Sequence, residues 1–213
     1  MFVLGITGSV GMGKTTAAQA FARAGYSVFD ADATVRALLA HDASAIAAVK
    51  RTFPAAVRGG TVDRTALAGL AFDDPAALAR LEGLLHKRVR QRERRFLADA
   101  KASGARLAVL DIPLLFETGG EKRVDAVLVV TAPAAVQKAR VMKRPGMTAH
   151  RFRAMRARQM SDREKRRRAT YVIDTGGEKR NMLREIRRLI KMLEREARPS
   201  FNKSPLQARK KQK

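Results

Sequence analysis

The chain has 213 residues, enough for one sizeable core, and its 46% hydrophobic and 30% charged residues are typical of a globular protein. It has no cysteine, which excludes disulfides, thiol nucleophiles and cysteine-ligated metals. Its net charge of +24 raises the question of a polyanionic partner. The longest apolar stretches, 107–116 and 124–135, are too short to span a bilayer, so we expect a cytoplasmic protein that does not enter a membrane.

The predicted elements begin with a strand and a helix on either side of a glycine-rich loop. Residues 2–7 predict a buried strand, and residues 14–24 predict a helix with Gly25 just past its end. A second strand at 26–29 and a helix at 32–40 follow. This order of elements indicates a parallel sheet with right-handed crossovers.

The next sixty residues change in character. Residues 42–103 are rich in Ala, Leu and Arg, with breaks at Pro54, at Gly59-Gly60 and near Pro75. No strand pattern interrupts them, so we expect a helical insertion between the second and third strands.

The remaining chain returns to alternating strands and helices. It predicts strands at 107–111, 126–131 and 171–174, a helix at 133–143, a very basic helical pair within 148–168 and an amphipathic closing helix at 179–195. We expect a single domain over 1–196, with its core at about 1–41, 104–140 and 169–196. The Ser/Pro/Lys/Gln-rich residues 197–213 predict a disordered basic tail.

The loop at 8–15 carries the pattern Gly-x-x-x-x-Gly-Lys-Thr in full, between a predicted strand and a predicted helix. Glycines let the backbone fold closely around an anion, and the loop amides with the helix N-terminus then face phosphate oxygens. In such a loop Lys14 would bridge the β- and γ-phosphates, and Thr15 would bind Mg²⁺. We call residues 8–15 the phosphate loop.

Three carboxylates follow predicted parallel strands, whose carboxyl ends face the ligand crevice. Asp30 and Asp32 close the second strand. Either one would orient or deprotonate an acceptor hydroxyl, or it would only cap the next helix, and spacing leaves both readings open. Asp111 ends the apolar run 107–110, a pattern that suits a water-mediated Mg²⁺ ligand.

Positive charge is concentrated at 138–168 and again at 195–213, where seven Lys/Arg stand against Glu196. Residues 138–168 hold 13 Lys/Arg against Asp162 and Glu164, and arginines there would grip a transferred phosphoryl group. Most of these side chains are nonetheless expected to be solvated helix surface. His86 lies in a predicted helical run, where a single histidine is more often structural than functional.

Together these residues resemble the dephospho-coenzyme A kinase family over most of the chain, from about residue 3 to 177. The most distinctive segment is Asp-x-Pro-Leu-Leu-Phe-Glu at 111–117. The other matches are, in chain order, 6–8, Lys14-Thr15, 30–32 with Arg36, 84–86, 129–130, 137–140, Arg144, Gln159 and 171–174.

The resemblance implies an α/β fold of the P-loop nucleoside-kinase-like, three-layer type: a five-stranded parallel sheet flanked by helices, with the helical insertion as acceptor site and 141–168 as lid. It implies that ATP with Mg²⁺ phosphorylates the ribose 3′-hydroxyl of dephospho-coenzyme A. These two small molecules are the expected partners, for a monomer or weak homo-oligomer.

The same resemblance assigns roles to residues. The catalytic ones would be Lys14, Asp32 and Arg140. The residues assigned to ATP are Gly11, Met12, Gly13, Lys14, Thr15, Thr16, Arg140 and Arg144. Those assigned to the acceptor are Thr7, Asp32, His86, Leu114 and Phe116. Those assigned to the metal are Thr15 and Asp111.

Two positions depart from the family pattern. The family usually has His-Pro where this chain has His86-Lys87, which removes a backbone restraint at an expected helix start. It usually has a small residue where this chain has Met12. Because the backbone amide at that position binds phosphate, we expect the side chain to point away and activity to survive.

Three other functions are possible for a chain with this sequence. A nucleoside-monophosphate kinase would share the fold but should lack the segment at 111–117. A GTPase would need an Asn-Lys-x-Asp motif, which neither Asn181 nor Asn202 begins. A nucleic-acid-binding protein would fit the charge, but the chain has no known nucleic-acid module and 5% aromatic residues, so no specific nucleic acid is expected.

Overall fold

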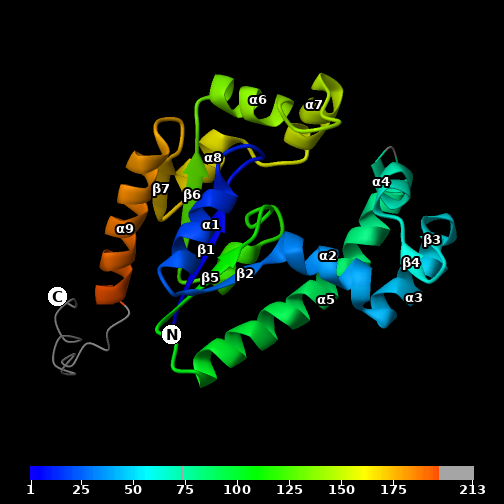
Figure 1. Cartoon of the computed structure of the whole chain (residues 1–213), viewed down its shortest axis with the longest axis horizontal. Coiled ribbons are helices and arrows are strands. Elements are labelled where there is room, and N and C mark those ends of the chain that lie inside the picture. The colour runs from blue at the N-terminus through cyan, green and yellow to red at the C-terminus, as the bar shows by residue number, and fades with distance from the viewer. Residues whose placement is uncertain (73, 197–213) are drawn as a thin grey trace, which may run out of the picture.

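Five parallel strands form the central sheet of the computed structural model, which describes residues 1–72 and 74–196 (Figure 1). The strands run in the order β2-β5-β1-β6-β7. Their bounds are β1 Phe2–Thr7, β2 Ser27–Asp30, β5 Leu107–Asp111, β6 Ala126–Thr131 and β7 Tyr171–Asp174. The predicted five-stranded parallel sheet is confirmed, and β1 lies at its centre because it pairs with both β5 and β6.

Alternate strand residues pack on opposite faces of the sheet, which divides the core in two. Residues such as Ile6 and Val109 face α1 (Lys14–Arg23) and α9 (Lys179–Glu196), which cover one side (Figure 1). Residues such as Leu110 and Val129 face α5 (Pro75–Ala102) and the chain that follows β5. The result is the predicted three-layer arrangement of helix, sheet and helix.

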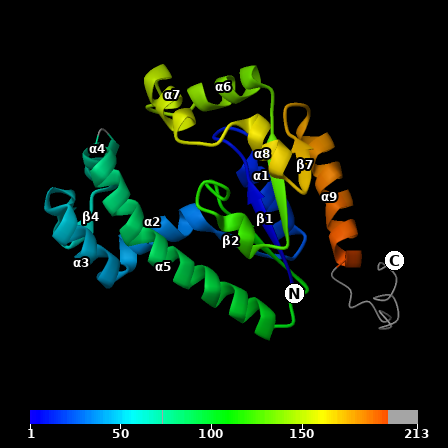
Figure 2. The ribbon, with the colours of Figure 1, turned by 180° about the vertical axis from the view of Figure 1, so that it is seen from behind.

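The helical insertion has a small core of its own. After α2 (Ala31–His41) come α3 (Ala43–Thr52), a short 3₁₀ turn at Pro54–Ala56, α4 (Arg64–Phe72) and the long α5. Their buried apolar side chains, Val49, Phe53, Leu67 and Leu85 among them, form a separate cluster. Figures 1 and 2 both show this cluster of helices at the end of the molecule opposite α9. α5 passes His86-Lys87 as one unbroken helix, so no helix begins there.

The expectation that no strand interrupts 42–103 is wrong. A two-stranded antiparallel hairpin, β3 (Val57–Arg58) and β4 (Thr61–Val62), lies within it. Gly59 and Gly60 both have positive φ angles, 55° and 76°, as a tight two-residue hairpin turn requires. The Gly-Gly pair is therefore a turn between strands and not only a break between helices. Each strand has two residues, too few for a visible alternation of polar and apolar side chains.

Three helices form the basic region after β6: α6 (Ala134–Met142), α7 (Ala149–Ala157) and α8 (Asp162–Arg168). α7 packs beside α6, away from the sheet, and both lie at the top of Figure 1. α8 instead packs on β6, where both carboxylate oxygens of Asp162 accept from the Thr131 hydroxyl. The predicted basic helical pair is confirmed, but only its first member stands clear of the sheet. The predicted tail at 197–213 lies outside the described residues.

Candidate active site

The phosphate loop lies between β1 and α1, as its sequence predicts. Gly11 and Gly13 have φ angles of 80° and 81°, a conformation in which other residues are strained. A Cβ on Gly11 would come within 2.5 Å of Val141, and one on Gly8 within 2.6 Å of the Val130 carbonyl oxygen. No side chain caps the N-terminus of α1, so its first amide groups are available to an anion.

Contacts from the C-terminal half of the chain hold this loop in shape. The Val10 N–H donates to Gln159 Oε1 at 3.1 Å, and Gln137 Nε2 donates to the Val10 carbonyl at 2.8 Å. The Thr175 hydroxyl donates to the Met12 carbonyl at 2.9 Å. The Met12 side chain is buried in the core against α1 and α9, away from the loop's open face as expected.

Lys14 begins α1 and forms an ion pair with Asp111 at the end of β5, with 2.5 Å between Nζ and Oδ1. The Asp111 side chain is 3% exposed. Burial raises the pKa of Asp111, while the Lys14 charge opposes this rise and the charges of Asp30 and Asp32 add to it. A cation beside Asp111 therefore stabilises its charged form, and here Lys14 supplies that cation.

The two candidate aspartates at the end of β2 have different surroundings. Asp30 is the N-cap of α2, and its Oδ1 accepts from the Ala33 N–H at 2.8 Å. Asp32 lies in the first turn of α2 and is exposed. Its carboxylate has no hydrogen-bond or ion-pair partner within residues 1–72 and 74–196. The capping role thus belongs to Asp30, which leaves the Asp32 carboxylate available to a ligand.

Two cavities meet at Asp32. One, of about 510 Å³, is lined by the phosphate loop, Thr16, Arg140, Arg144 and Thr175. The other, of about 580 Å³, lies between α2, α5 and the chain after β5, and its lining includes His86 and Leu114. Four residues line both cavities, and they are Asp32, Pro113, Met155 and Gln159. A group bound in one cavity would therefore adjoin a group bound in the other at these residues.

Arg140 reaches the first cavity from α6 and is held by one residue of the loop after β7. Its Nη1 donates to Thr175 Oγ1 at 3.0 Å and its Nη2 to the Thr175 carbonyl at 2.6 Å. Thr175 is buried. It also lies against the loop at Gly13, where a Cβ added to the glycine would come within 3.0 Å of the Thr175 hydroxyl. Thr175 therefore fixes the guanidinium of Arg140 relative to the phosphate loop.

Replacing Thr175 with valine keeps the side-chain shape and removes the hydroxyl. We expect the kcat/KM for ATP to fall about 30-fold, because the hydroxyl makes two hydrogen bonds and a net of about 1 kcal/mol for each gives about 2 kcal/mol in all. Thr175→Ser keeps the hydroxyl, so it should retain most of the wild-type kcat/KM for ATP. Steady-state kinetics with varied ATP measure both variants. Wild-type kinetics in Thr175→Val would contradict this role.

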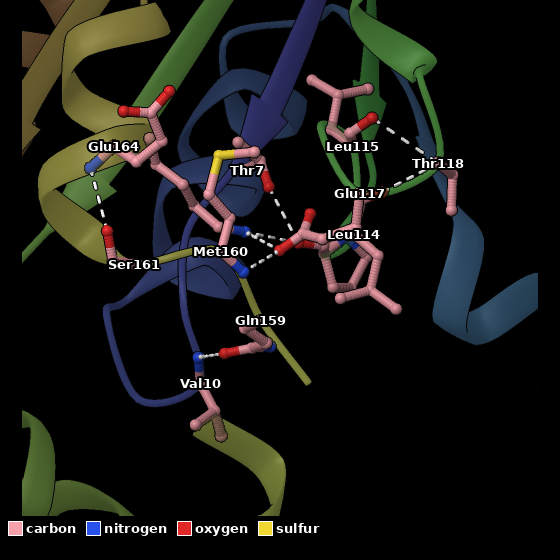
Figure 3. Close-up of polar contacts among 12 residues, drawn as sticks. Thr7, Val10, Leu114, Leu115, Glu117, Thr118, Gln159, Met160, Ser161 and Glu164 are labelled. Carbon is pink, nitrogen blue, oxygen red and sulfur yellow. Dashed lines mark hydrogen bonds and ion pairs between the residues drawn. The ribbon is translucent and has the colours of Figure 1, made fainter. Parts of the chain in front are cut away.

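The segment at 111–117 is fixed from beneath by a buried cation. Lys165 of α8 has 0% side-chain exposure, lies 2.9 Å from Glu117 Oε1 and donates to the Pro113 carbonyl at 3.2 Å. Glu117 Oε1 also accepts from the Met160 N–H, and the Thr7 hydroxyl donates to Pro113 (Figure 3). These contacts hold Pro113 at the boundary of the two cavities and Leu114 next to it in the wall of the second cavity.

We expect Lys165→Met to lower the free energy of unfolding by about 3 kcal/mol, because Glu117 would keep a largely buried charge without its partner. Adding Glu117→Gln removes that charge and keeps an acceptor for the Met160 N–H, so it should recover part of the loss. Urea unfolding of the single and double variants measures the change. A single variant as stable as the wild type would contradict the assigned role of Lys165.

The structure brings most of the predicted site residues together. Those that line the first cavity are Gly11, Met12, Gly13, Lys14, Thr15, Thr16, Asp32, Arg140 and Arg144. His86 and Leu114 line the second cavity with Asp32. Three residues lie behind the cavity walls instead: Asp111 and Thr7 are buried beneath them, and Phe116 packs in the core below the Arg168 guanidinium.

Thr175 and Gln159 contribute to the site without having been assigned a role from sequence. Thr175 directly follows a parallel strand, at the sheet edge where ligands bind, and that position was the available signal. Gln159 matched a family pattern, but no local feature of its sequence indicates a contact with residue 10.

Comparisons with known proteins agree with this geometry. A family model described as dephospho-CoA kinase matches residues 2–181. A dephospho-CoA kinase of Rhodopseudomonas palustris is 53% identical over 175 residues, which cover 82% of this chain and 87% of that protein. A dephospho-CoA kinase of Brucella melitensis is 48% identical over 190 residues, which cover 89% of this chain and 94% of that protein.

Solved structures give the same result. TT1252 from Thermus thermophilus is 39% identical, with a TM-score of 0.76 over 90% of this chain and 97% of that one. The dephospho-CoA kinase from Campylobacter jejuni has a TM-score of 0.69 at 20% identity over 91% of this chain and 98% of that one, which shows the fold alone.

No helix within the described ranges, 1–72 and 74–196, has the length and apolar character needed to cross a membrane.

Proposed function

The chain belongs to the dephospho-CoA kinase family, and we propose that Lys14, Asp32 and Arg140 carry the reaction of that family where the two cavities meet. The reaction is the ATP-dependent phosphorylation of dephospho-CoA, the last step of coenzyme A synthesis. The observation that carries the assignment of residues is the position of Asp32, which lines both cavities and has an unpaired carboxylate in the described part of the chain.

ATP would occupy the cavity lined by the phosphate loop. The uncapped N-terminus of α1 and the loop amides offer donors to the β-phosphate, and the positive end of the helix dipole favours its charge. Arg140 and Arg144 line the same cavity and add positive charge beside the phosphates. The loop after β7, fixed to Arg140 through Thr175, would lie beside the adenine.

The chemical step is the attack of the ribose 3′-hydroxyl oxygen of dephospho-CoA on the γ-phosphorus of ATP. The bond from that phosphorus to the β–γ bridging oxygen breaks, its electron pair stays on that oxygen, and ADP leaves. Asp32 would orient the hydroxyl and accept its proton, which then passes to water. Lys14 and Arg140 would stabilise the charge on the phosphoryl and departing oxygens.

Oxygen donors near Lys14 fit a magnesium ion. Thr15 is exposed in the first turn of α1, and Asp111 is a buried carboxylate whose charged form is stabilised by a cation. Mg²⁺ usually binds one or two protein oxygens together with phosphates and water, and Thr15 and Asp111 would supply these two protein oxygens. Bound there, Mg²⁺ would neutralise phosphate charge.

Dephospho-CoA would occupy the cavity beside the insertion. Its wall combines apolar side chains, such as Leu114 and Val89, with polar ones, such as His86 and Arg90, as a ligand with apolar and charged parts requires. Phe116 would support this wall from the core, and Thr7 would do so through Pro113. In this proposal 42–103 is the acceptor-binding part of one kinase domain over 1–196.

The segment at 141–168 would act as the lid, and its moving part would be α7. Met155 of α7 and Gln159, just after it, line both cavities, while α8 is held to the sheet side by Lys165 and Asp162. Closure over both substrates would exclude water and so limit ATP hydrolysis. We also propose that the protein acts in the cytoplasm as a monomer or weak homo-oligomer.

The test of function is an acceptor panel with ATP and Mg²⁺. Dephospho-CoA should give ADP and CoA, and ³¹P NMR of the product should place the new phosphate on the ribose 3′-oxygen. AMP, CMP and UMP should react far more slowly. Faster phosphorylation of any of these monophosphates than of dephospho-CoA would overturn the proposal.

A further inference from the structure

In the described ranges, 1–72 and 74–196, only Gln159 combines three positions: it follows α7, it contacts the phosphate loop through its side chain, and it lines both cavities. The contact is with Val10, and the cavities are those proposed for the nucleotide and the acceptor. Figure 3 shows its side chain directed at the Val10 backbone. Its position alone therefore places it beside the path between the two cavities.

The contact with Val10 determines which end of the Gln159 amide is free. A backbone N–H can only donate, so the atom that it meets must be the amide oxygen, Oε1, at 3.1 Å. The nitrogen, Nε2, is then the other end of the group, with two N–H donors. Nε2 makes no hydrogen bond to the described part of the chain.

The surroundings of Gln159 indicate what those donors are for. The residues that line both cavities with it are Asp32, Pro113 and Met155, of which Asp32 and Pro113 offer acceptors and Met155 is apolar. A phosphoryl group that crosses this boundary carries charge on its three equatorial oxygens, and donors in a water-excluded site stabilise such charge.

We propose that Gln159 is a further catalytic residue, which donates from Nε2 to the transferred phosphoryl group while its Oε1 holds the phosphate loop at Val10. The inference rests on the proposed function, because it takes the boundary of the cavities as the place of transfer. The Val10 contact gives the side chain a fixed geometry before substrates bind. It also makes the segment after α7 part of the site rather than only a cover for it.

Two methionine variants separate this role from simple support of the loop. Gln159→Met removes both the donors and the Val10 contact. Gln137→Met is the matched control, since Gln137 holds Val10 from the other side and lines neither of the two cavities. The readouts are kcat, the Kd of ADP, and the Kd of ADP with aluminium fluoride and dephospho-CoA, which together mimic the transition state.

We expect Gln159→Met to lower kcat about 10- to 100-fold and to weaken the aluminium fluoride complex by a similar factor, since one donor at developing charge contributes about that much. The Kd of ADP should rise by a similar small factor in both methionine variants, about fivefold at most, because each loses one hydrogen bond to Val10, and kcat in Gln137→Met should fall by no more than that factor. Gln159→Glu keeps an acceptor for the Val10 N–H and loses the donors, so it should lose kcat as well.

Two results would overturn the inference. Equal losses of kcat and of ADP affinity in both methionine variants would mean that Gln159 only supports the loop. Wild-type kcat in Gln159→Glu would mean that the donors play no part. Failure of the proposed function is a separate outcome, because it would appear as absent dephospho-CoA phosphorylation in the wild-type enzyme.

Discussion

Lys14→Ala should lower turnover with dephospho-CoA about 1000-fold. Lys14 is the cation at the start of α1, and it lies within the cavity that the phosphate loop lines. Without Lys14, no ammonium from α1 stabilises the negative charge that develops on the transferred phosphoryl group. Single-turnover measurement of ADP formation, with enzyme and ATP in excess over dephospho-CoA, gives the rate of the chemical step.

The variant needs a control for folding, because Lys14 also pairs with Asp111. Burial already raises the pKa of Asp111, and loss of Lys14 removes the charge that opposes this rise, so the pKa should rise further. Circular dichroism and urea unfolding check that the variant is native. A folded Lys14→Ala enzyme within tenfold of wild-type turnover would contradict the assigned role.

Asp32→Asn should lower kcat by about 100- to 10,000-fold, the range for loss of a positioned general base. The KM for ATP should change less than threefold, because the loop amides, Lys14 and Arg140 remain in place. Asparagine keeps the size and polarity of the side chain. A large fall in kcat with an unchanged KM for ATP would therefore show that the carboxylate orients the hydroxyl and accepts its proton. Steady-state kinetics with each substrate varied measure both parameters.

Asp30→Asn is the matched control for this variant. Asp30 lies two residues away on the same strand end and caps α2, and asparagine caps a helix as well as aspartate does. Its kcat should stay within threefold of the wild type. If Asp32→Asn retained near wild-type turnover, Asp32 would be no more than a residue of the first helical turn.

Features within one stretch of chain were predictable from sequence. The phosphate loop, β1 and α1 follow from a local pattern of glycines and apolar residues, and β5 and β6 follow from buried apolar runs. Sequence could not assign Asp30 and Asp32, because the choice depends on which residue has the extended backbone of an N-cap. The structure shows that it is Asp30.

Contacts between distant segments were not predictable in this way. Lys165 looks like one more surface cation in a basic run, yet it is buried because Glu117 and Pro113, some fifty residues earlier, surround it. Thr175 and Gln159 contact loop residues about 150 positions away. No periodicity or local motif records such a pairing, so one sequence alone leaves these residues without a role.

The phosphate loop is made early in synthesis, but what holds it is made late. Val10 and Met12 are fixed by Gln137, Gln159 and Thr175, and β1 has no strand partner until β5 and β6 exist. A nascent chain that ends before α6 carries the complete nucleotide motif without any of these three contacts. The order in which the ribosome makes this protein therefore delays the ATP site until most of the enzyme has emerged.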